Sequence, residues 1–315
     1  MRRQREFIVT AIIMLGLAAV LFTGCGELPD DGSVPGGETE TAYPLRLTDD
    51  AGREVTIDAK PERIISFGPG HTETLFALGL GGKMVGVDDF SDYPAAAWDI
   101  ERIGDTVSPN YEKILSLAPD VVFTVGSEET EIVARLDELG VSVVVLQAES
   151  VADILDDMLT IGRITATAAA AEELVGNLRA EIEAVAARAV QIPDNERPAV
   201  FYEVMPPGQW GMWTAGPGSY IDDMINIAGG KNIAGDVTAA YTTYSEEVLM
   251  AKNPAIIITP FPETLAEIGQ RPGWETIAAV QNGRVFWVDR DAGSRPGPRI
   301  VEALKEIAAA VIPAE

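Results

Sequence analysis

The sequence predicts an α/β protein with two lobes, each a mainly parallel sheet flanked by helices. Short apolar runs typical of buried strands alternate with amphipathic helical stretches in both halves of the chain. One long helical stretch lies between the halves, and the halves share motifs in the same order. We therefore expect one long rigid helix to join the lobes, so that the two lobes form a clamp. The expected ranges are 61–150 for the first lobe, 151–192 for the linking helix and 193–315 for the second lobe.

The linking stretch runs from Val151 to Gln191 without a proline and is interrupted only by a Gly-Arg pair at Gly162. From Thr167 to Val190 it consists almost entirely of strong helix formers, which predicts a helix about 36 Å long at ~1.5 Å per residue. Apolar residues recur in it every three or four positions and predict one stripe that faces a core: Leu174, Leu178, Ile182, Val185 and Ala189. The alternative is an ordinary long core helix that joins nothing.

Two pairs of motifs are repeated on either side of this helix. Gly-Pro-Gly and Gly-Gly-Lys bracket residues 68–83 and again residues 216–231, and the offset between the two copies is 148 residues. In the second pair, Asn110 and Ser245 each precede a glutamate by two residues and a proline by nine, and an apolar β run follows. The motifs are short, so the alternative is chance, but their matched order favours two related lobes.

The amino terminus and the charge indicate the compartment. The chain has 23 basic and 49 acidic residues, a net charge of −26, which argues against a nucleic-acid partner. Three arginines precede an apolar run, 7–22, that is too short for a comfortable membrane span and ends at Phe22-Thr23-Gly24-Cys25, which resembles a bacterial lipobox. We expect a signal peptide over 1–24, a lipid anchor on Cys25, a polar tether over 25–42 and a hairpin over 43–60. A nucleophilic role for this single cysteine is the alternative.

Several motifs carry a resemblance to a known family. They are RIISFGPGHTETLFALGLGGKMVGV, DYP at 92–94, SPNYEKILSLAPDVV, AGPGSYIDDMINIAGGKNI, YSEEVLMAKNPAIIIT and RPGPRIVEAL. From about Pro61 to the end, the chain resembles the helical-backbone class of substrate-binding proteins of ABC importers. That resemblance implies an exported, lipid-anchored monomer that takes a small-molecule ligand between its lobes and delivers it to an ABC permease dimer with its ATPase. It also implies that Glu112 and Glu247, one in each lobe, dock on arginines of the permease.

The resemblance is closest to the vitamin B12-binding branch, and it implies a set of ligand contacts. Aromatic contacts fall at Tyr93, Trp213 and Tyr241, and the spacing of Asp291 and Arg295 matches an acid and a base that contact corrin amides. Val125 departs from the pattern, because some cobalamin binders have an aromatic residue near it, and Trp210 is the candidate substitute. Core packing is the alternative for each aromatic residue. The transported ligand is therefore expected to be cobalamin, with a ferric siderophore or haem as alternatives, and no cofactor is expected.

His71 is the only histidine, and a metal-binding branch would need several His, Asp or Glu ligands, so we do not expect a zinc or manganese carrier. An axial bond from His71 to haem iron or cobalt, or a simple contact with the ligand, stays open. An enzyme is the rival class, but the chain lacks the Gly-x-Ser-x-Gly elbow of serine hydrolases and the Gly-Lys-Ser/Thr of phosphate loops. A structural or adhesive lipoprotein is the third alternative. It would need no cleft, so the repeated motifs on either side of a long helix argue against it. We therefore expect a receptor with no catalytic residues and no protein-bound metal.

Overall fold

The computed structural model describes residues 41–126 and 131–312, which belong to one compact unit, Thr39–Glu315. The expected signal peptide, the lipobox with Cys25 and nearly all of the tether lie outside the described residues. Among the residues that are described, no helix is both long and apolar enough to cross a membrane.

The first lobe is built on a four-stranded parallel sheet in the order β4-β3-β5-β6. Its strands are β3 (Ile64–Ser66), β4 (Met84–Val87), β5 (Val121–Thr124) and β6 (Val143–Val145). Its helices are α1 (Pro69–Ala77), α2 (Tyr111–Ser116), α3 (Glu131–Glu138) and the 3-10 turns Gly81–Lys83 and Ala95–Asp99. The strands β1 (Leu45–Thr48) and β2 (Glu54–Ile57) form an antiparallel hairpin that packs on this lobe.

The second lobe repeats this topology, because its sheet has the order β9-β7-β11-β12 and all its pairs are parallel. Its strands are β7 (Ala199–Tyr202), β9 (Lys231–Asn232), β11 (Ile256–Thr259) and β12 (Val285–Trp287). Its helices are α6 (Tyr220–Ile227), α7 (Glu246–Lys252), α8 (Pro262–Glu267), α9 (Ala278–Gln281), α10 (Arg290–Ser294) and α11 (Ile300–Val311), with 3-10 turns at Ile268–Gln270 and Trp274–Thr276. One antiparallel pair, β8 (Trp213–Ala215) with β10 (Tyr241–Thr243), has no counterpart in the first lobe's described residues.

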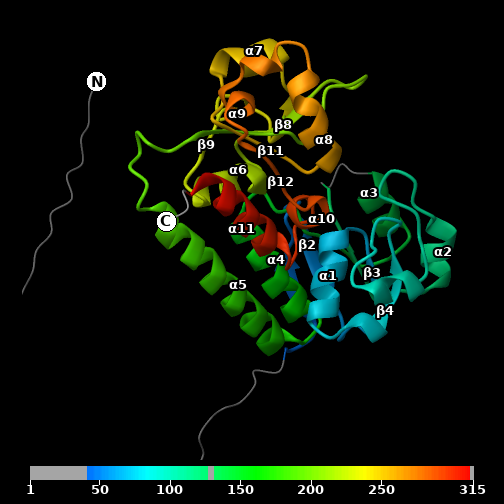
Figure 1. Ribbon diagram of the computed structural model, residues 1–315. Helices are drawn as coiled ribbons and strands as arrows, with labels where there is room; N and C mark the ends of the chain where they lie inside the picture. Colours follow the sequence, from blue (N-terminus) through cyan, green and yellow to red (C-terminus); the bar gives the residue numbers. More distant parts are fainter. Residues whose placement is uncertain (1–40, 127–130, 313–315) are drawn as a thin grey trace, which may run out of the picture. The chain divides into compact units, whose positions relative to one another are not determined.

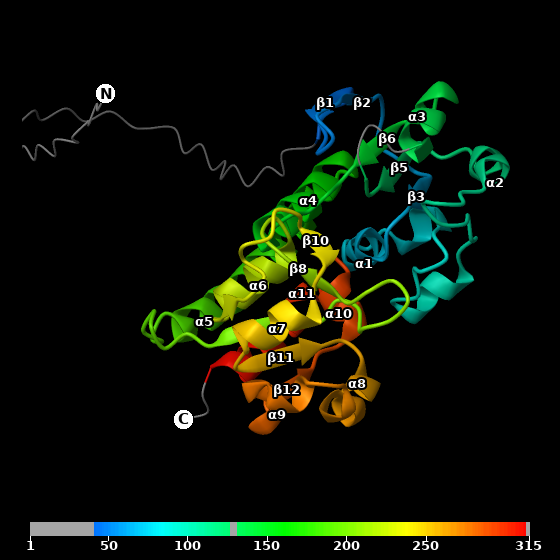
Figure 2. The ribbon, with the colours of Figure 1, turned by 90° about the horizontal axis from the view of Figure 1, so that it is seen from above.

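Both sheets are buried on both faces, as parallel sheets are. The β5 strand Val-Val-Phe-Thr and the β11 strand Ile-Ile-Ile-Thr are buried at every position. On the first sheet, one face packs on α1 and α4 and the other on α2 and α3. On the second, α6 and α11 cover one face and α7 and α9 the other. The predicted two-lobed α/β fold is confirmed, and Figures 1 and 2 show the two lobes beside the linking helices.

The link between the lobes is a pair of packed helices, α4 (Val151–Ile164) and α5 (Ala168–Ala189). The prediction of one continuous helix over 151–192 is wrong at residues 165–167, where Ala166 adopts a φ of 54° and ends the regular helix. A Cβ on Gly162 would lie 2.4 Å from the Cβ of Ala171, so the glycine allows the two helices to pack closely. The predicted apolar stripe of α5 is buried or partly buried against the core, which includes α11. The 22 residues of α5 span about 33 Å.

Candidate ligand-binding site

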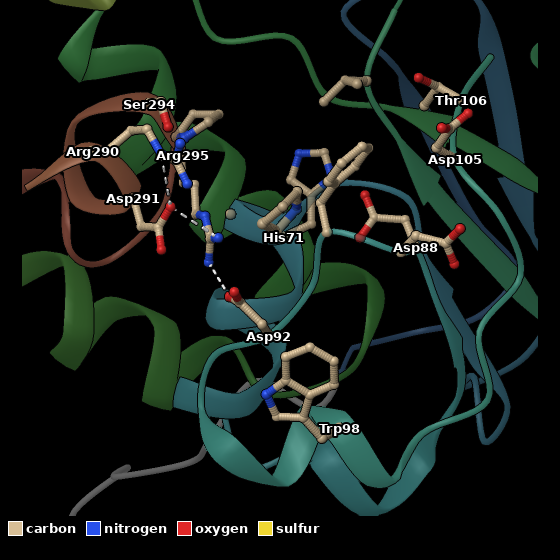
Figure 3. A pocket seen from close by; sticks show the side chains of 17 residues that line it. His71, Asp88, Asp92, Trp98, Asp105, Thr106, Arg290, Asp291, Ser294 and Arg295 are labelled. Carbon is tan, nitrogen blue, oxygen red and sulfur yellow. Dashed lines mark hydrogen bonds and ion pairs between the residues drawn. The ribbon is translucent and has the colours of Figure 1, made fainter. Parts of the chain in front are cut away.

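A cavity of about 600 Å³ lies between the first lobe and α10 of the second lobe. The first lobe contributes residues that follow the carboxyl ends of its strands, which is where open α/β sheets bind ligands. Figure 3 shows Arg290, Asp291 and Ser294 on one side of this cavity and Asp88, Asp105 and Thr106 on the other. The lining is Gly68, Pro69, Gly70, His71, Asp88, Asp89, Phe90, Asp92, Trp98, Asp105, Thr106, Val125, Arg290, Asp291, Ser294, Arg295 and Pro296.

The cavity wall is acidic. Of the described residues, five aspartates line it, at positions 88, 89, 92, 105 and 291, against two arginines, Arg290 and Arg295. Burial raises the pKa of Asp88, although a hydrogen bond of 2.5 Å from Ser91 opposes this. Even without Asp88, the aspartates of the wall outnumber its arginines. This excess of carboxylates favours a ligand that is neutral or cationic, or one that donates hydrogen bonds.

Arg295, which was predicted from the sequence to contact the ligand, lines the cavity but is already paired with carboxylates. It is 9% exposed, and its guanidinium lies between Asp92 and Asp291, with nitrogen–oxygen distances of 2.6 and 3.1 Å (Figure 3). Burial alone would lower the pKa of Arg295, but the hydrogen bond to Asp92 and the neighbouring carboxylates raise it. The same hydrogen bond lowers the pKa of Asp92. Arg295 is therefore a charged side chain whose charge is compensated within the protein, and Asp291 shares that network.

His71 lies at the start of α1, in the cavity wall, and is 2% exposed. Neither ring nitrogen has a hydrogen-bond partner among the described residues. Burial lowers the pKa of His71 to about 4, so the ring is neutral at physiological pH. In the part of the chain that the structure describes, no group of three or more His, Cys, Asp or Glu is placed to hold a metal ion.

The four aromatic residues that were predicted from the sequence to contact the ligand do not line the cavity. Tyr93 is 48% exposed and carries the guanidinium of Arg299 over its ring at 4.2 Å. Trp213 lies in β8 and donates its indole N–H to the carbonyl oxygen of Trp210 at 2.9 Å. Trp210 itself is 71% exposed, and Tyr241 is 39% exposed in β10. These residues sit on loops and on the extra antiparallel pair, outside the cavity wall.

Comparisons with known proteins agree with this architecture. The model of a family described as periplasmic binding protein matches residues 64–292, more than two thirds of the chain. This chain belongs to the periplasmic binding protein family. An uncharacterized ABC transporter substrate-binding lipoprotein of Bacillus subtilis is 31% identical to it over 94% of this chain and 95% of the relative.

Two solved structures share the two-lobed fold of this periplasmic binding protein. The periplasmic vitamin B12-binding protein of Vibrio cholerae is 28% identical, with a TM-score of 0.71 over 80% of this chain and 96% of its own. A periplasmic heme-binding protein from Roseiflexus is also 28% identical, with a TM-score of 0.68 over 79% of this chain and 97% of its own. The likeness therefore covers one protein named for vitamin B12 and one named for heme.

Two aromatic residues that were not predicted from the sequence lie in the described part of this binding protein's cavity wall. Phe90 and Trp98 line the cavity and remain 62% and 64% exposed. Both belong to the segment after β4, where Trp98 lies in a 3-10 turn beneath the guanidinium of Arg102, 4.8 Å from the ring centroid. Their position after a buried strand was an available signal, because ligand contacts gather at the carboxyl ends of parallel strands.

The two glutamates expected to dock on a permease occupy equivalent helices of this binding protein. Glu112 is exposed in the first turn of α2, where the side chain of Asn110 accepts a hydrogen bond of 3.0 Å from the backbone N–H of Lys113. Glu247 is exposed in the first turn of α7. The helix dipole favours a carboxylate at both places, so their charge is compatible with a structural role as well as with docking.

Proposed function

We propose that this protein is the extracytoplasmic receptor of an ABC importer and that its cargo is a corrinoid of the cobalamin type. A ferric siderophore or haem is the alternative cargo. The observation that carries the proposal is an acidic cavity of about 600 Å³ between the two lobes, with exposed Phe90 and Trp98 in its wall. A volume of this order lies in the usual range of small-molecule sites.

The charge of the cavity supports a corrinoid over haem. Haem carries two carboxylates, and these would face an excess of aspartates, while Arg295 is already paired with Asp92 and Asp291. A corrinoid instead has a rim of carboxamides, whose N–H groups donate hydrogen bonds to carboxylates. Its flat face can pack on aromatic rings such as Phe90 and Trp98. The vitamin B12-binding protein of Vibrio cholerae, with the same fold, supports this cargo, and the Roseiflexus heme-binding protein supports the alternative.

The route of delivery follows from the same proposal. A lipid on Cys25 would hold the receptor at the outer face of the cell membrane, as the name of the Bacillus subtilis lipoprotein supports. Glu112 and Glu247, at matching places in two similar lobes, would each meet one subunit of a two-fold permease. Ion pairs at such an interface guide association more than they determine its final strength.

The test is a set of calorimetric titrations with cyanocobalamin, cobinamide, haem and a ferric hydroxamate. We expect cyanocobalamin and cobinamide to bind, and we expect Phe90→Ala and Trp98→Ala each to weaken binding about tenfold, since an aromatic contact contributes about 0.5–1.5 kcal/mol beyond its buried area. Trp287→Ala, which removes an exposed tryptophan outside the cavity, is the control and should bind normally. If haem or the hydroxamate binds and neither corrinoid does, the corrinoid proposal is wrong and the alternative cargo replaces it.

A further inference from the structure

The two lobes touch each other beside the cavity, at a place far in sequence from the α4–α5 link. Gly70 at the start of α1 lies against Pro296 and Gly297, which follow α10. A Cβ on Gly70 would lie 2.2 Å from the carbonyl oxygen of Pro296, and one on Gly297 would lie 2.9 Å from the Cα of Gly70. The backbones of the two lobes are therefore in direct contact, with no side chain between them.

A buried carboxylate fastens this contact. Glu73, on α1 of the first lobe, is 4% exposed and accepts hydrogen bonds from two arginines of the second lobe. Arg299 donates through Nε at 2.9 Å and through Nη2 at 2.7 Å, and Arg295 donates through Nη1 at 3.3 Å. The bond to Glu73 raises the pKa of Arg299. The two-pronged geometry fixes the direction as well as the distance of the pair.

A second carboxylate also crosses between the lobes, but its environment differs. Asp92 of the first lobe accepts a hydrogen bond of 2.6 Å from Arg295. The side chain of Asp92 is 38% exposed, whereas that of Glu73 is 2% exposed. Ion pairs that water reaches are weak and exchange readily, while breaking a buried pair leaves an uncompensated charge. Among the described residues, a buried bridge at Glu73 and a solvent-accessible bridge at Asp92 thus both connect the lobes.

We propose that Glu73 is a positioning residue of the binding site. Through Arg299 and the Gly70–Gly297 backbone contact it forms a fixed pivot between the lobes, and through Arg295 it holds a guanidinium at the cavity wall. The Asp92–Arg295 bridge is not part of the pivot, and it is the bond that an acceptor group of the ligand can replace. Because the charge of Arg295 is already compensated, that group is a neutral acceptor such as a carboxamide oxygen. The identity of this acceptor group rests on the proposed corrinoid cargo, whereas the pivot is independent of the cargo.

The pivot is tested without ligand, by measuring the distance between spin labels on the two lobes. Labels are placed at Ser116 of α2 and Glu267 of α8, both exposed, in the full chain carrying Cys25→Ser and purified in detergent. We expect one narrow distance distribution for the parent protein and for Asp92→Asn, and a clearly broadened one for Glu73→Gln. An unchanged distribution in Glu73→Gln, or a broadening in Asp92→Asn equal to it, would overturn the pivot.

A matched control separates positioning from simple loss of stability. Glu203 is as deeply buried as Glu73, and it bonds Arg271, Thr259 and Thr264 within the second lobe only. Glu203→Gln should lower the melting temperature to a similar degree and leave the distance distribution narrow. A broadening in this control equal to that of Glu73→Gln would show that any lost buried ion pair loosens the lobes, and the pivot would then be rejected.

The effect on binding is measured with cyanocobalamin on the same set of variants. Glu73→Gln should weaken its affinity about tenfold because Arg295 loses its support, whereas Glu203→Gln should leave the affinity within twofold of the parent. Equal affinities for Glu73→Gln and the parent would refute a positioning role in binding. If the parent protein itself does not bind cyanocobalamin, the cargo proposal fails, and the ligand-free distances still decide the pivot.

Discussion

Asp157 offers the sharpest test of how the amino-terminal hairpin is held. Its side chain is buried in α4 and faces Asp50, in the turn between β1 and β2. Asp50 is fixed there, because its backbone N–H donates to the carbonyl oxygen of Val145 at 3.1 Å and its carboxylate accepts from the N–H of Gln147 at 2.6 Å. Burial, and next the charge and hydrogen bond of Asp50, raise the pKa of Asp157 from 3.8 to about 9.

The cost to stability follows from linkage. In the unfolded chain Asp157 is ionised at pH 7, and in the folded protein it is protonated, so folding takes up one proton. Between a pKa of 3.8 and pH 7 this costs about 4 kcal/mol, at about 1.4 kcal/mol per unit. The folded state binds more protons across this window, so stability falls as the pH rises from about 4 to about 9. Asp157→Asn has the same shape, no charge and a donor for Asp50, and should be about 2–4 kcal/mol more stable at pH 7.

The assay is urea unfolding of the parent and Asp157→Asn at intervals between pH 4 and pH 9. The difference in unfolding free energy should be near zero at pH 4 and should grow by about 1.4 kcal/mol per pH unit. Asp156→Asn, which removes the neighbouring exposed carboxylate of α4, is the control and should show no such slope. A difference that does not change with pH, or an asparagine variant that is less stable than the parent at pH 7, would refute the reasoning.

Four further outcomes are expected. Between pH 7 and pH 5 the unfolding free energy of the parent should fall by about 2 kcal/mol more than that of His71→Gln. The reason is that the buried ring has a pKa of about 4, whereas in the unfolded chain it takes up a proton as the pH falls through 6.5. Equal losses of unfolding free energy in urea would contradict this. Gly70→Ala should lower the unfolding free energy by about 1–3 kcal/mol, because its Cβ meets backbone of the other lobe; a stable variant would mean that the contact yields easily. Glu112→Ala with Glu247→Ala should leave ligand affinity and melting temperature unchanged, while uptake into permease-containing vesicles falls and receptor–permease association loses much of its salt dependence; loss of ligand binding would assign both residues to the pocket. Cys25→Ser should abolish lipid labelling of the expressed protein, and unchanged labelling would disprove the anchor.

Local pattern was enough to predict the two-lobed fold. The runs that became β5 and β11 are apolar at nearly every position because both faces of a parallel sheet are buried, so each strand can be recognised from a few consecutive residues. The matched Asn110 and Ser245 motifs begin equivalent helices, α2 and α7, in sheets of the same strand order. Helix-forming residues likewise predicted α5, but not the turn at Ala166 that lets α4 and α5 pack against each other at Gly162 and Ala171.

The chemistry of the cavity depended on contacts between distant residues. The sequence around Arg295 predicted a cation that contacts the ligand. In the structure Arg295 bonds Glu73 and Asp92, which lie 222 and 203 residues away in the other lobe. His71 and Asp157 have ordinary sequence surroundings. Burial is the largest cause of the shift in both pKa values, and at Asp157 the neighbouring Asp50 adds to it. Hydrophobic periodicity is a property of short segments and can be read along the chain. Charge compensation and desolvation depend on which segments meet in space, and the tertiary structure alone brings them together.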